Sequence, residues 1–305
     1  MKRRRGAVLL AICGVFFWFL AGAGHVRQAA AEALSLCANS ILPSLFPFLV
    51  LSGLLLSLGF GELVSPHLAG FMTPLFRLPG SASTALILGL AGGYPIGAAA
   101  AGQLYREGLL TRDEAERLLG FCNNANPVFL VSVLGSGVFQ SVRVGVWLWL
   151  IHILSALLTG LFFRDGKESP GAKWVARETP SRTVSFPAAL VGAVKGGLSG
   201  VLSVCAFVVF FYVLSSPLAK SGGTWGALLV GLTELFSLTP LISPDALGFV
   251  LASGCAGWGG LSVLCQTAAV LEESGLGLRN CLAGKALQGI LAAVLALVLC
   301  PWVLS

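Results

Sequence analysis

The sequence predicts an all-α polytopic membrane protein, an inverted-repeat, transporter-like bundle with re-entrant or broken helices. Of the 305 residues, 56% are apolar and only 10% are charged, whereas a soluble protein carries about 25% charged residues. Apolar runs of about 20 residues, long enough to cross a bilayer, recur from one end of the chain to the other. The 39 glycines favour closely packed membrane helices. These observations exclude a soluble globular fold and make the lipid bilayer the expected surroundings.

The basic residues predict how the chain is oriented. Lys2 and the arginines at 3–5 precede the first apolar run, and a second basic group lies in the loop 164–187. The members of this second group are Arg164, Lys167, Lys173, Arg177 and Arg182. Clustered Lys and Arg in short loops mark the cytoplasmic side of a membrane protein. We therefore expect a cytoplasmic N-terminus, a cytoplasmic basic loop and no nucleic-acid partner.

Sequence motifs of catalysis and metal binding are missing. The chain has no HExxH, no GxSxG and no Walker A string, so we expect neither an enzyme nor a protein with its own ATP motor. The eight cysteines form no CxxC pair and no Cys/His ligand spacing. Cysteine in an apolar run behaves as a small hydrophobe. We expect no metal site and no cofactor.

Residues 1–33 are predicted to form an N-terminal span and an amphipathic linker. The apolar run 7–24 follows the basic cluster, and its aromatic end favours an uncleaved span. The small residues after this run leave a cleaved signal peptide as the alternative. Residues 26–40 are amphipathic and lead to the next span.

Residues 34–163 are predicted to form the first repeat and a connecting span. The apolar runs in this part are 41–60, opened by Pro43 and Pro47, then 84–105, 118–139 and 143–163. Residues 61–80 contain three prolines and Arg77, and we expect an interfacial or broken helix there. Five crossings would put the basic loop on the wrong side of the membrane. Residues 84–105 are the natural candidate for a re-entrant hairpin, because a Gly-Gly-Tyr-Pro string interrupts them; a crossing by 61–80 is the alternative.

Residues 188–305 are predicted to form a second, inverted repeat. Its spans are expected at 188–216, 224–243, 246–271 and 280–304. In both halves a glycine-rich break carries one aromatic residue, Tyr94 or Trp258, and a glutamine follows eight or nine residues later. Two similar units of opposite orientation are typical of transporters that bind their substrate near the bilayer midplane. The alternative is a chance resemblance between glycine-rich helices.

Three amides interrupt the apolar run 118–139: Asn123, Asn124 and Asn126, followed by Pro127. Side-chain amides in such a run are costly unless they are hydrogen-bonded or line a wet cavity. Because Pro127 removes a backbone donor, we expect the helix to unwind here. The amides and the freed carbonyls could bind a substrate or a cation, or they could form a hydrogen-bonded clamp between helices.

Glu234 is the only acidic residue well inside an apolar run, and we therefore expect it to bind the coupling ion or proton. The alternative is a structural ion pair with Lys195 or Lys285. Lys285 and Gln288 lie one turn apart and form a polar stripe on the last span. His152 is expected to be packed in the core.

The two glycine-rich breaks are expected to face the substrate. Their aromatic rings could stack on a planar solute, or they could fill the bends of the chain. The full predicted substrate site consists of Gly93, Tyr94, Pro95, Asn123, Asn124, Asn126, Trp258, Gln266 and Lys285.

Four strings of this chain resemble the YlbJ-type sporulation integral membrane proteins of endospore-forming bacteria, which carry the Gate or nucleoside-recognition domain. They are Gly93–Gly97, Glu114–Leu119, Phe121–Pro127 and Gly231–Glu234. The resemblance covers about residues 35–300 and implies a layout similar to concentrative nucleoside transporters. It also implies a role in spore formation, with dipicolinic acid carried from the mother cell toward the forespore across the outer forespore membrane.

The expected function is transport of a small polar or anionic solute, such as dipicolinic acid, by alternating access around a midplane site with H+ or Na+ as coupling ion. No sequence feature selects dipicolinate over a nucleoside, so a nucleoside-type transporter is one alternative. A non-transporting scaffold for spore maturation is another. Expected partners are a second copy of the chain or other sporulation membrane proteins.

Overall fold

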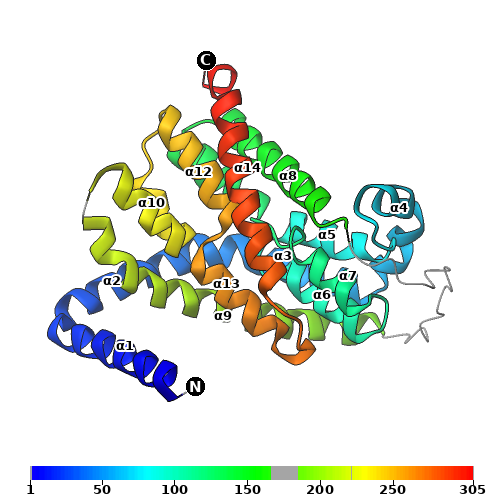
Figure 1. The fold of residues 1–305 in the computed structure, drawn as a ribbon, viewed down its shortest axis with the longest axis horizontal. Helices are drawn as coiled ribbons and strands as arrows, with labels where there is room; N and C mark the ends of the chain where they lie inside the picture. The colour runs from blue at the N-terminus through cyan, green and yellow to red at the C-terminus, as the bar shows by residue number, and fades with distance from the viewer. Residues whose placement is uncertain (1, 166–184, 221, 305) are drawn as a thin grey trace.

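The computed structural model describes residues 2–165, 185–220 and 222–304, and every regular element in these ranges is a helix (Figure 1). The predicted all-α fold is therefore confirmed. Four basic residues of the predicted cytoplasmic loop lie outside the described ranges: Lys167, Lys173, Arg177 and Arg182. The elements are α1 Lys2–Ala21, α2 Ala23–Leu36, η1 Cys37–Ile41, α3 Leu42–Ser57, α4 Phe60–Phe76, α5 Ala82–Gly92, α6 Ile96–Arg106, α7 Arg112–Leu118, η2 Phe129–Val138, α8 Val142–Phe162, α9 Phe186–Lys220, α10 Gly223–Thr233, α11 Leu235–Leu238, η3 Thr239–Leu241, α12 Ala246–Trp258, α13 Gly260–Leu271, η4 Glu272–Ser274 and α14 Arg279–Val303.

Five helical segments in the described ranges are long and apolar enough to cross a membrane, so the chain is a multi-pass membrane protein. They are Ala23–Ser57, Val142–Phe162, Phe186–Ala219, Ala246–Ser274 and Arg279–Val303. Large apolar side chains on the outer helices are exposed, among them Leu10 and Phe17 on α1 and Val298 on α14. Lipid is the solvent that such a surface favours.

The predicted linker 26–40 and span 41–60 form one continuous helix, not two segments. α2 passes into α3 through the π-helical turn η1. A π turn shifts the backbone hydrogen bonds by one residue, so the helix passes Pro43 without ending. α1 is a separate helix, and its apolar part, Gly6–Ala21, is shorter than the predicted run 7–24.

The segment 61–80 forms a single helix, α4, which its internal prolines do not break. Arg117 holds the end of α4 by donating hydrogen bonds to the carbonyl oxygens of Phe76 and Arg77, each at 3.2 Å. The same guanidinium donates to the carbonyl oxygen of Phe163, at the end of α8, at 3.4 Å. The ends of α4, α7 and α8 therefore meet at one end of the bundle, which we call the α7 end.

α5 and α6 form a hairpin within 84–105, where the sequence predicts one; that this hairpin is re-entrant in the membrane stays a prediction. The chain reverses at Gly93–Pro95, where Gly93 has a φ of 88°, a backbone angle that favours glycine. The hydroxyl of Ser81 donates to the carbonyl oxygen of Leu109 at 3.2 Å and joins the two outer ends of the hairpin. Both arms therefore start and finish at the α7 end.

The run 118–139 divides into an unwound segment, 119–126, and the helical turns that follow it. α7 ends at Leu118, residues 119–126 leave the helix, and Pro127 begins the next helical turn. Proline is well suited to a first helical position, because its missing N–H has no partner there in any case. Gly135 in η2 contacts Gly145 in α8, so this segment runs antiparallel to α8.

The predicted span 224–243 is wrong as a single crossing helix. α10 and the short α11 fold back on each other around Glu234, so that Gly231 contacts Leu238. The reason is local: the backbone of Glu234 is extended, with φ of −151°, and its side chain caps the new helix by accepting from the N–H of Ser237. Side-chain capping of this kind ends one helix and begins another.

The two breaks that the sequence pairs have different geometry. The first turns back at Tyr94, whereas α12 continues into α13 as part of one 29-residue span. In the second half, the segment that turns back is the one at Glu234. Hairpin α5–α6 therefore corresponds in shape to α10–α11, and α3 packs along α9. The division into repeats at 34–163 and 188–305 stays a prediction.

Candidate functional site

A narrow cavity lies where the interrupted segments of both halves meet, and we call it the central cavity. Hairpin α5–α6, the unwound segment, α11 and α13 each contribute to its wall, and α3 and α9 close it. Its lining residues are Leu45, Tyr94, Ala125, Asn126, Phe129, Val204, Leu235, Phe236, Val263 and Gln266. Three of these are among the predicted substrate residues: Tyr94, Asn126 and Gln266.

The tip of the first hairpin contacts the break between α12 and α13. The hydroxyl of Tyr94 donates to the carbonyl oxygen of Ala256 at 2.7 Å, and a Cβ on Gly259 would lie 3.1 Å from that hydroxyl oxygen. Gly259 has a φ of 86°, which also favours glycine. Pro95 follows Tyr94 at the turn. The predicted aromatic of the first break therefore joins the two halves of the chain.

Asn126 joins the first hairpin to the unwound segment. Its amide nitrogen donates to the carbonyl oxygen of Gly92 at 2.9 Å, and its side-chain oxygen accepts from the N–H of Val128 at 2.7 Å. Gly93 packs against Asn126 so closely that a Cβ would lie 2.7 Å from the asparagine Cβ. On the opposite wall of the cavity, the amide of Gln266 donates to the hydroxyl of Ser262 at 3.2 Å. The cavity thus combines two side-chain amides with aromatic and aliphatic walls.

Behind Tyr94 lies a group of fully or almost fully buried polar side chains, which we call the polar cluster. Its members are Asn123, Asn124, His152, Thr267, Lys285 and Gln288. The ammonium of Lys285 donates to the backbone oxygen of Asn123 at 2.8 Å and to the side-chain oxygen of Gln288 at 2.6 Å. It also lies 5.0 Å from the centre of the Tyr94 ring, within the distance of a cation–π interaction.

The other members of the cluster hold the unwound backbone in place. The amide of Gln288 donates to the side-chain oxygen of Asn124 at 3.0 Å, and Asn123 donates to the hydroxyl of Thr267 at 2.8 Å. His152 is buried, as expected, and its Nε2 accepts the N–H of Ala125 at 3.0 Å. Buried polar groups of an unwound segment need such partners, because water is not available to replace them.

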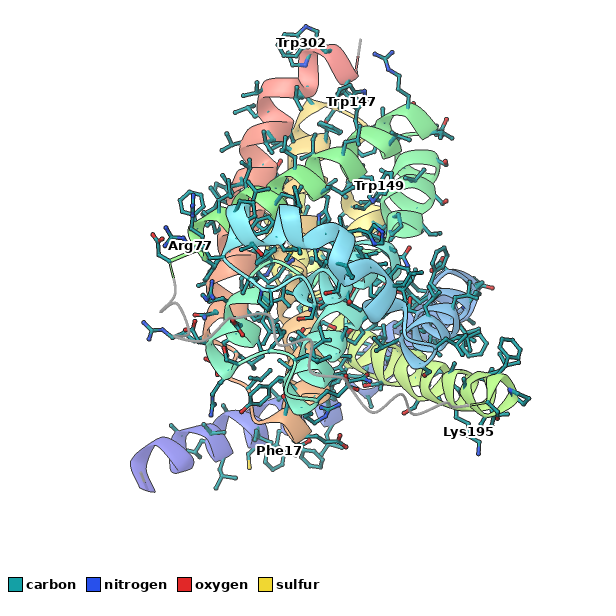
Figure 2. The ribbon with its side chains drawn as sticks, turned by 90° about the vertical axis from the view of Figure 1, so that its right-hand side faces the viewer. Phe17, Arg77, Trp147, Trp149, Lys195 and Trp302 are labelled. Atoms are coloured by element: carbon teal, nitrogen blue, oxygen red, sulfur yellow. The ribbon has the colours of Figure 1, made fainter. Side chains whose placement is uncertain are left out.

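Glu234 lies at the turn between α10 and α11, and it is buried. Its carboxylate accepts from the N–H and from the hydroxyl of Ser237, at 2.5 and 2.6 Å. In the part of the chain that the structure describes, no ion pair joins it to a lysine, so the alternative of a structural ion pair is wrong there. Lys195 is exposed on α9, and Figure 2 shows it pointing away from the molecule. The neighbours of Glu234, Leu235 and Phe236, line the central cavity.

Trp258 is not among the residues that line the central cavity. Its indole N–H donates to the carbonyl oxygen of Leu232 in α10 at 2.9 Å. Most of the predicted substrate residues therefore lie on the cavity or in the polar cluster. Gly93 and Pro95 flank Tyr94 at the hairpin turn, and Trp258 lies outside both groups.

Sequence reasoning missed Thr267 and Ser237, which bind Asn123 and Glu234. A signal was available for both, since each is a small polar residue inside an apolar run, close to a residue that had been singled out. Small hydroxyl residues also occur in membrane helices for packing alone, so their presence did not separate a partner from a packing residue.

Comparison with known proteins agrees with this picture. Residues 38–301 match the Gate family, described as nucleoside recognition. The chain is 30% identical to the sporulation integral membrane protein YlbJ of Bacillus subtilis (strain 168), over 339 residues that cover 95% of this chain and 82% of that protein. No solved structure matches the chain. Because the family match extends over most of its length, this multi-pass membrane protein belongs to the Gate (nucleoside recognition) family.

Proposed function

We propose that the protein transports a small anionic solute across the membrane, with the central cavity as the substrate site. The observation that carries the proposal is the meeting of both hairpins and the unwound segment around one cavity. Irregular backbone at membrane depth is tolerated where protein or a water-filled cavity surrounds it. Transporters with broken helices place their substrates at such junctions. Movement of a hairpin would open the cavity to one side at a time, which is alternating access.

The positive charge near the cavity supports an anionic substrate. Lys285 is fully buried and has no carboxylate partner among the described residues. Its ammonium lies against the Tyr94 ring, and Tyr94 also lines the central cavity. An uncompensated positive charge in a medium of low dielectric constant attracts an anion more strongly than it would in water.

Dipicolinate is the substrate that we favour. It is a flat aromatic dianion, and the lining of the cavity includes Phe129 and Phe236, which pack edge to face against each other with ring centres 4.7 Å apart. The amides of Asn126 and Gln266 can donate to carboxylate oxygens once the cavity opens. We propose that this transport takes place in spore formation, at the outer forespore membrane; the likeness to the Bacillus sporulation protein supports the role in spore formation.

Glu234 is the proposed site of a coupling proton, because it is a buried carboxylate at the turn of the second hairpin, next to the cavity wall. Intramembrane carboxylates commonly carry protons in transporters. Other sporulation membrane proteins or a second copy of the chain are the proposed partners.

The test is uptake of labelled dipicolinate by proteoliposomes that contain the full chain. We expect saturable uptake that nucleosides and an unrelated dicarboxylate do not inhibit. Gln266→Glu keeps the shape of the side chain but places a negative charge at the cavity. Because a hydrogen bond to a charged group is worth about 1.5–3 kcal/mol, uptake at low solute concentration should fall about tenfold or more.

The matched control is Gln140→Glu, the same substitution at an exposed turn between η2 and α8, which should leave uptake unchanged. Uptake that nucleosides inhibit would move the substrate class to nucleosides. No uptake and no binding by folded protein would instead support the scaffold.

A further inference from the structure

We infer that the ammonium of Lys285 fills a cation site beside the unwound segment. It occupies the place that a sodium ion would otherwise take, so the protein binds no sodium ion there. The inference deepens the proposed function, because it removes one of the two expected coupling ions at this site. Whether the lysine side chain fills a cation site can be tested even if the protein transports nothing.

The groups around Lys285 are of the kinds that bind a cation. An unwound turn exposes backbone carbonyls that no helical N–H reaches, and Asn123 presents one of them to Lys285. The side-chain oxygen of Gln288 and the face of the Tyr94 ring complete the contacts. Oxygen atoms and an aromatic face attract a cation. They provide no hydrogen-bond donor for the lone pair of a neutral amine.

The direction of the hydrogen bonds is fixed along a chain of amides. Gln288 donates through its nitrogen to the side-chain oxygen of Asn124, and Asn124 donates through its nitrogen to the carbonyl oxygen of Phe121 at 2.9 Å. A carbonyl oxygen can only accept. Asn124 must therefore present its oxygen to Gln288, and Gln288 must present its oxygen to Lys285.

One further oxygen of this site is unused. The side-chain oxygen of Asn123 is buried and has no hydrogen-bond partner within the described ranges, while the nitrogen of the same amide binds Thr267. Without the lysine, the backbone oxygen of Asn123 and the side-chain oxygen of Gln288 would also lose a partner. Buried oxygen atoms without partners are costly, and a small monovalent cation in place of the ammonium would restore a partner to the two oxygens that Lys285 now binds.

The position of Lys285 links the cation to the substrate. A sodium ion would leave with each transport cycle, whereas an ammonium on α14 stays. The positive charge that faces the Tyr94 ring is then carried by the chain itself, and the cavity attracts an anion without a second ion having to bind first. This is a physical reason for an anionic substrate and for a coupling proton at Glu234 instead of sodium.

The test compares the melting temperature of the purified full chain in NaCl, KCl and choline chloride at equal ionic strength. The wild type should melt at the same temperature in all three salts. Lys285→Ala should melt lower in choline and should recover by about 3 °C in NaCl or KCl, the shift expected when a ligand saturates its site about tenfold. Lys285→Met, which fills the space with an apolar chain, should be destabilised without recovering in any salt.

Lys195→Ala is the matched control, because it removes an exposed lysine from α9 and should respond to no salt. Folded Lys285→Ala protein that ignores all three salts would overturn the inference, and so would wild-type protein stabilised by NaCl over choline chloride. If neither Lys285 variant folds, the wild-type comparison still decides. Absence of dipicolinate uptake, by contrast, would count against the proposed function and would leave these melting temperatures unaffected.

Discussion

At the scale of single residues, glycines decide how closely the first hairpin approaches the unwound segment. A Cβ on Gly89 or on Gly97 would overlap the carbonyl oxygen of Cys122. Backbone atoms cannot rotate away as a side chain can, so these positions accept only glycine. The contact brings the hairpin against the unwound backbone, where the carbonyl oxygen of Asn123 binds Lys285, and the geometry of the cavity depends on it.

Gly97→Ala should therefore destabilise the protein. Overpacking against a rigid neighbour costs about 1–3 kcal/mol, so the melting temperature in detergent should fall by several degrees. The control is Gly192→Ala on α9, where a Cβ would meet nothing within 4 Å; alanine favours the helix there, and the melting temperature should stay equal or rise. Equal melting temperatures for Gly97→Ala and wild type would show that the hairpin can move away from Cys122.

The polar residues could be found from the sequence, but their grouping could not. An amide or a lysine inside an apolar run stands out, because its burial is costly without a partner. The partner itself is set by tertiary structure: Lys285 binds an oxygen 162 positions away in the chain, and no local pattern predicts that distance. For the same reason, the sequence placed Asn123, Asn126 and Trp258 in one site, whereas the structure assigns them to three different surroundings.

At the scale of elements, two short segments from different halves are joined at the α7 end. Glu116 of α7 accepts from the N–H of Gly277 at 3.0 Å and from Arg112 at 2.9 Å. Arg112 also donates to the carbonyl oxygen of Gly275 at 2.8 Å. Partial burial by itself would raise the pKa of Glu116. The two hydrogen bonds and the charge of Arg112 outweigh burial and lower this pKa below its ordinary value of 4.5.

This link should make stability depend on pH. A carboxyl with a lowered pKa in the folded protein contributes stability above its ordinary value, and the contribution is lost as the pH falls through the lowered pKa. Glu116→Gln should therefore lower the melting temperature by about 2 °C at neutral pH, and the difference from wild type should shrink below pH 4.5.

Glu107→Gln is the matched control for this experiment, because Glu107 is exposed and accepts only a local hydrogen bond from Gln103. Its melting temperature should follow that of the wild type at every pH. A Glu116→Gln protein that differs from wild type by the same amount at neutral and acidic pH would contradict the role given to the carboxylate.

The elements themselves were predicted with mixed success, for a physical reason. The break at Gly93–Pro95 was visible because glycine and proline close together weaken a helix, although single prolines inside α3 and α4 do not break those helices. The reversal at Glu234 was not, because no glycine or proline marks that position and the turn depends on a side-chain cap from Glu234 to Ser237. Pro43 shows the opposite error. The sequence predicts a new span that begins at this proline, but the helix continues through it after a π turn.

At the scale of the whole molecule, α8 is long and apolar enough to cross a membrane, and it connects the α7 end to the other end of the bundle. α8 begins near α14's last residues, where Arg143 donates to the carbonyl oxygen of Trp302 at 2.9 Å, and it ends beside Arg117. The predicted basic loop follows α8. By the distribution of basic residues, the α7 end should be cytoplasmic.

Labelling of single cysteines by a membrane-impermeant maleimide tests this orientation. In a background in which Cys13, Cys205 and Cys265, the cysteines that are not buried, are replaced by Ser, Gln140→Cys should react in intact cells. Glu107→Cys should react only after the cells are permeabilised. Both positions are exposed, so the comparison reports the side of the membrane and not burial; the reverse pattern would overturn the orientation.

The hydrogen bond between the Tyr94 hydroxyl and the Ala256 carbonyl oxygen has a consequence for leakage. It connects the tip of hairpin α5–α6 to α12 in the other half of the chain, and Tyr94 also lines the cavity. In the proposed mechanism, this hydrogen bond must break before the hairpin can move away from α12. A protein built this way should resist uncoupled flow of ions through its centre while the bond is intact.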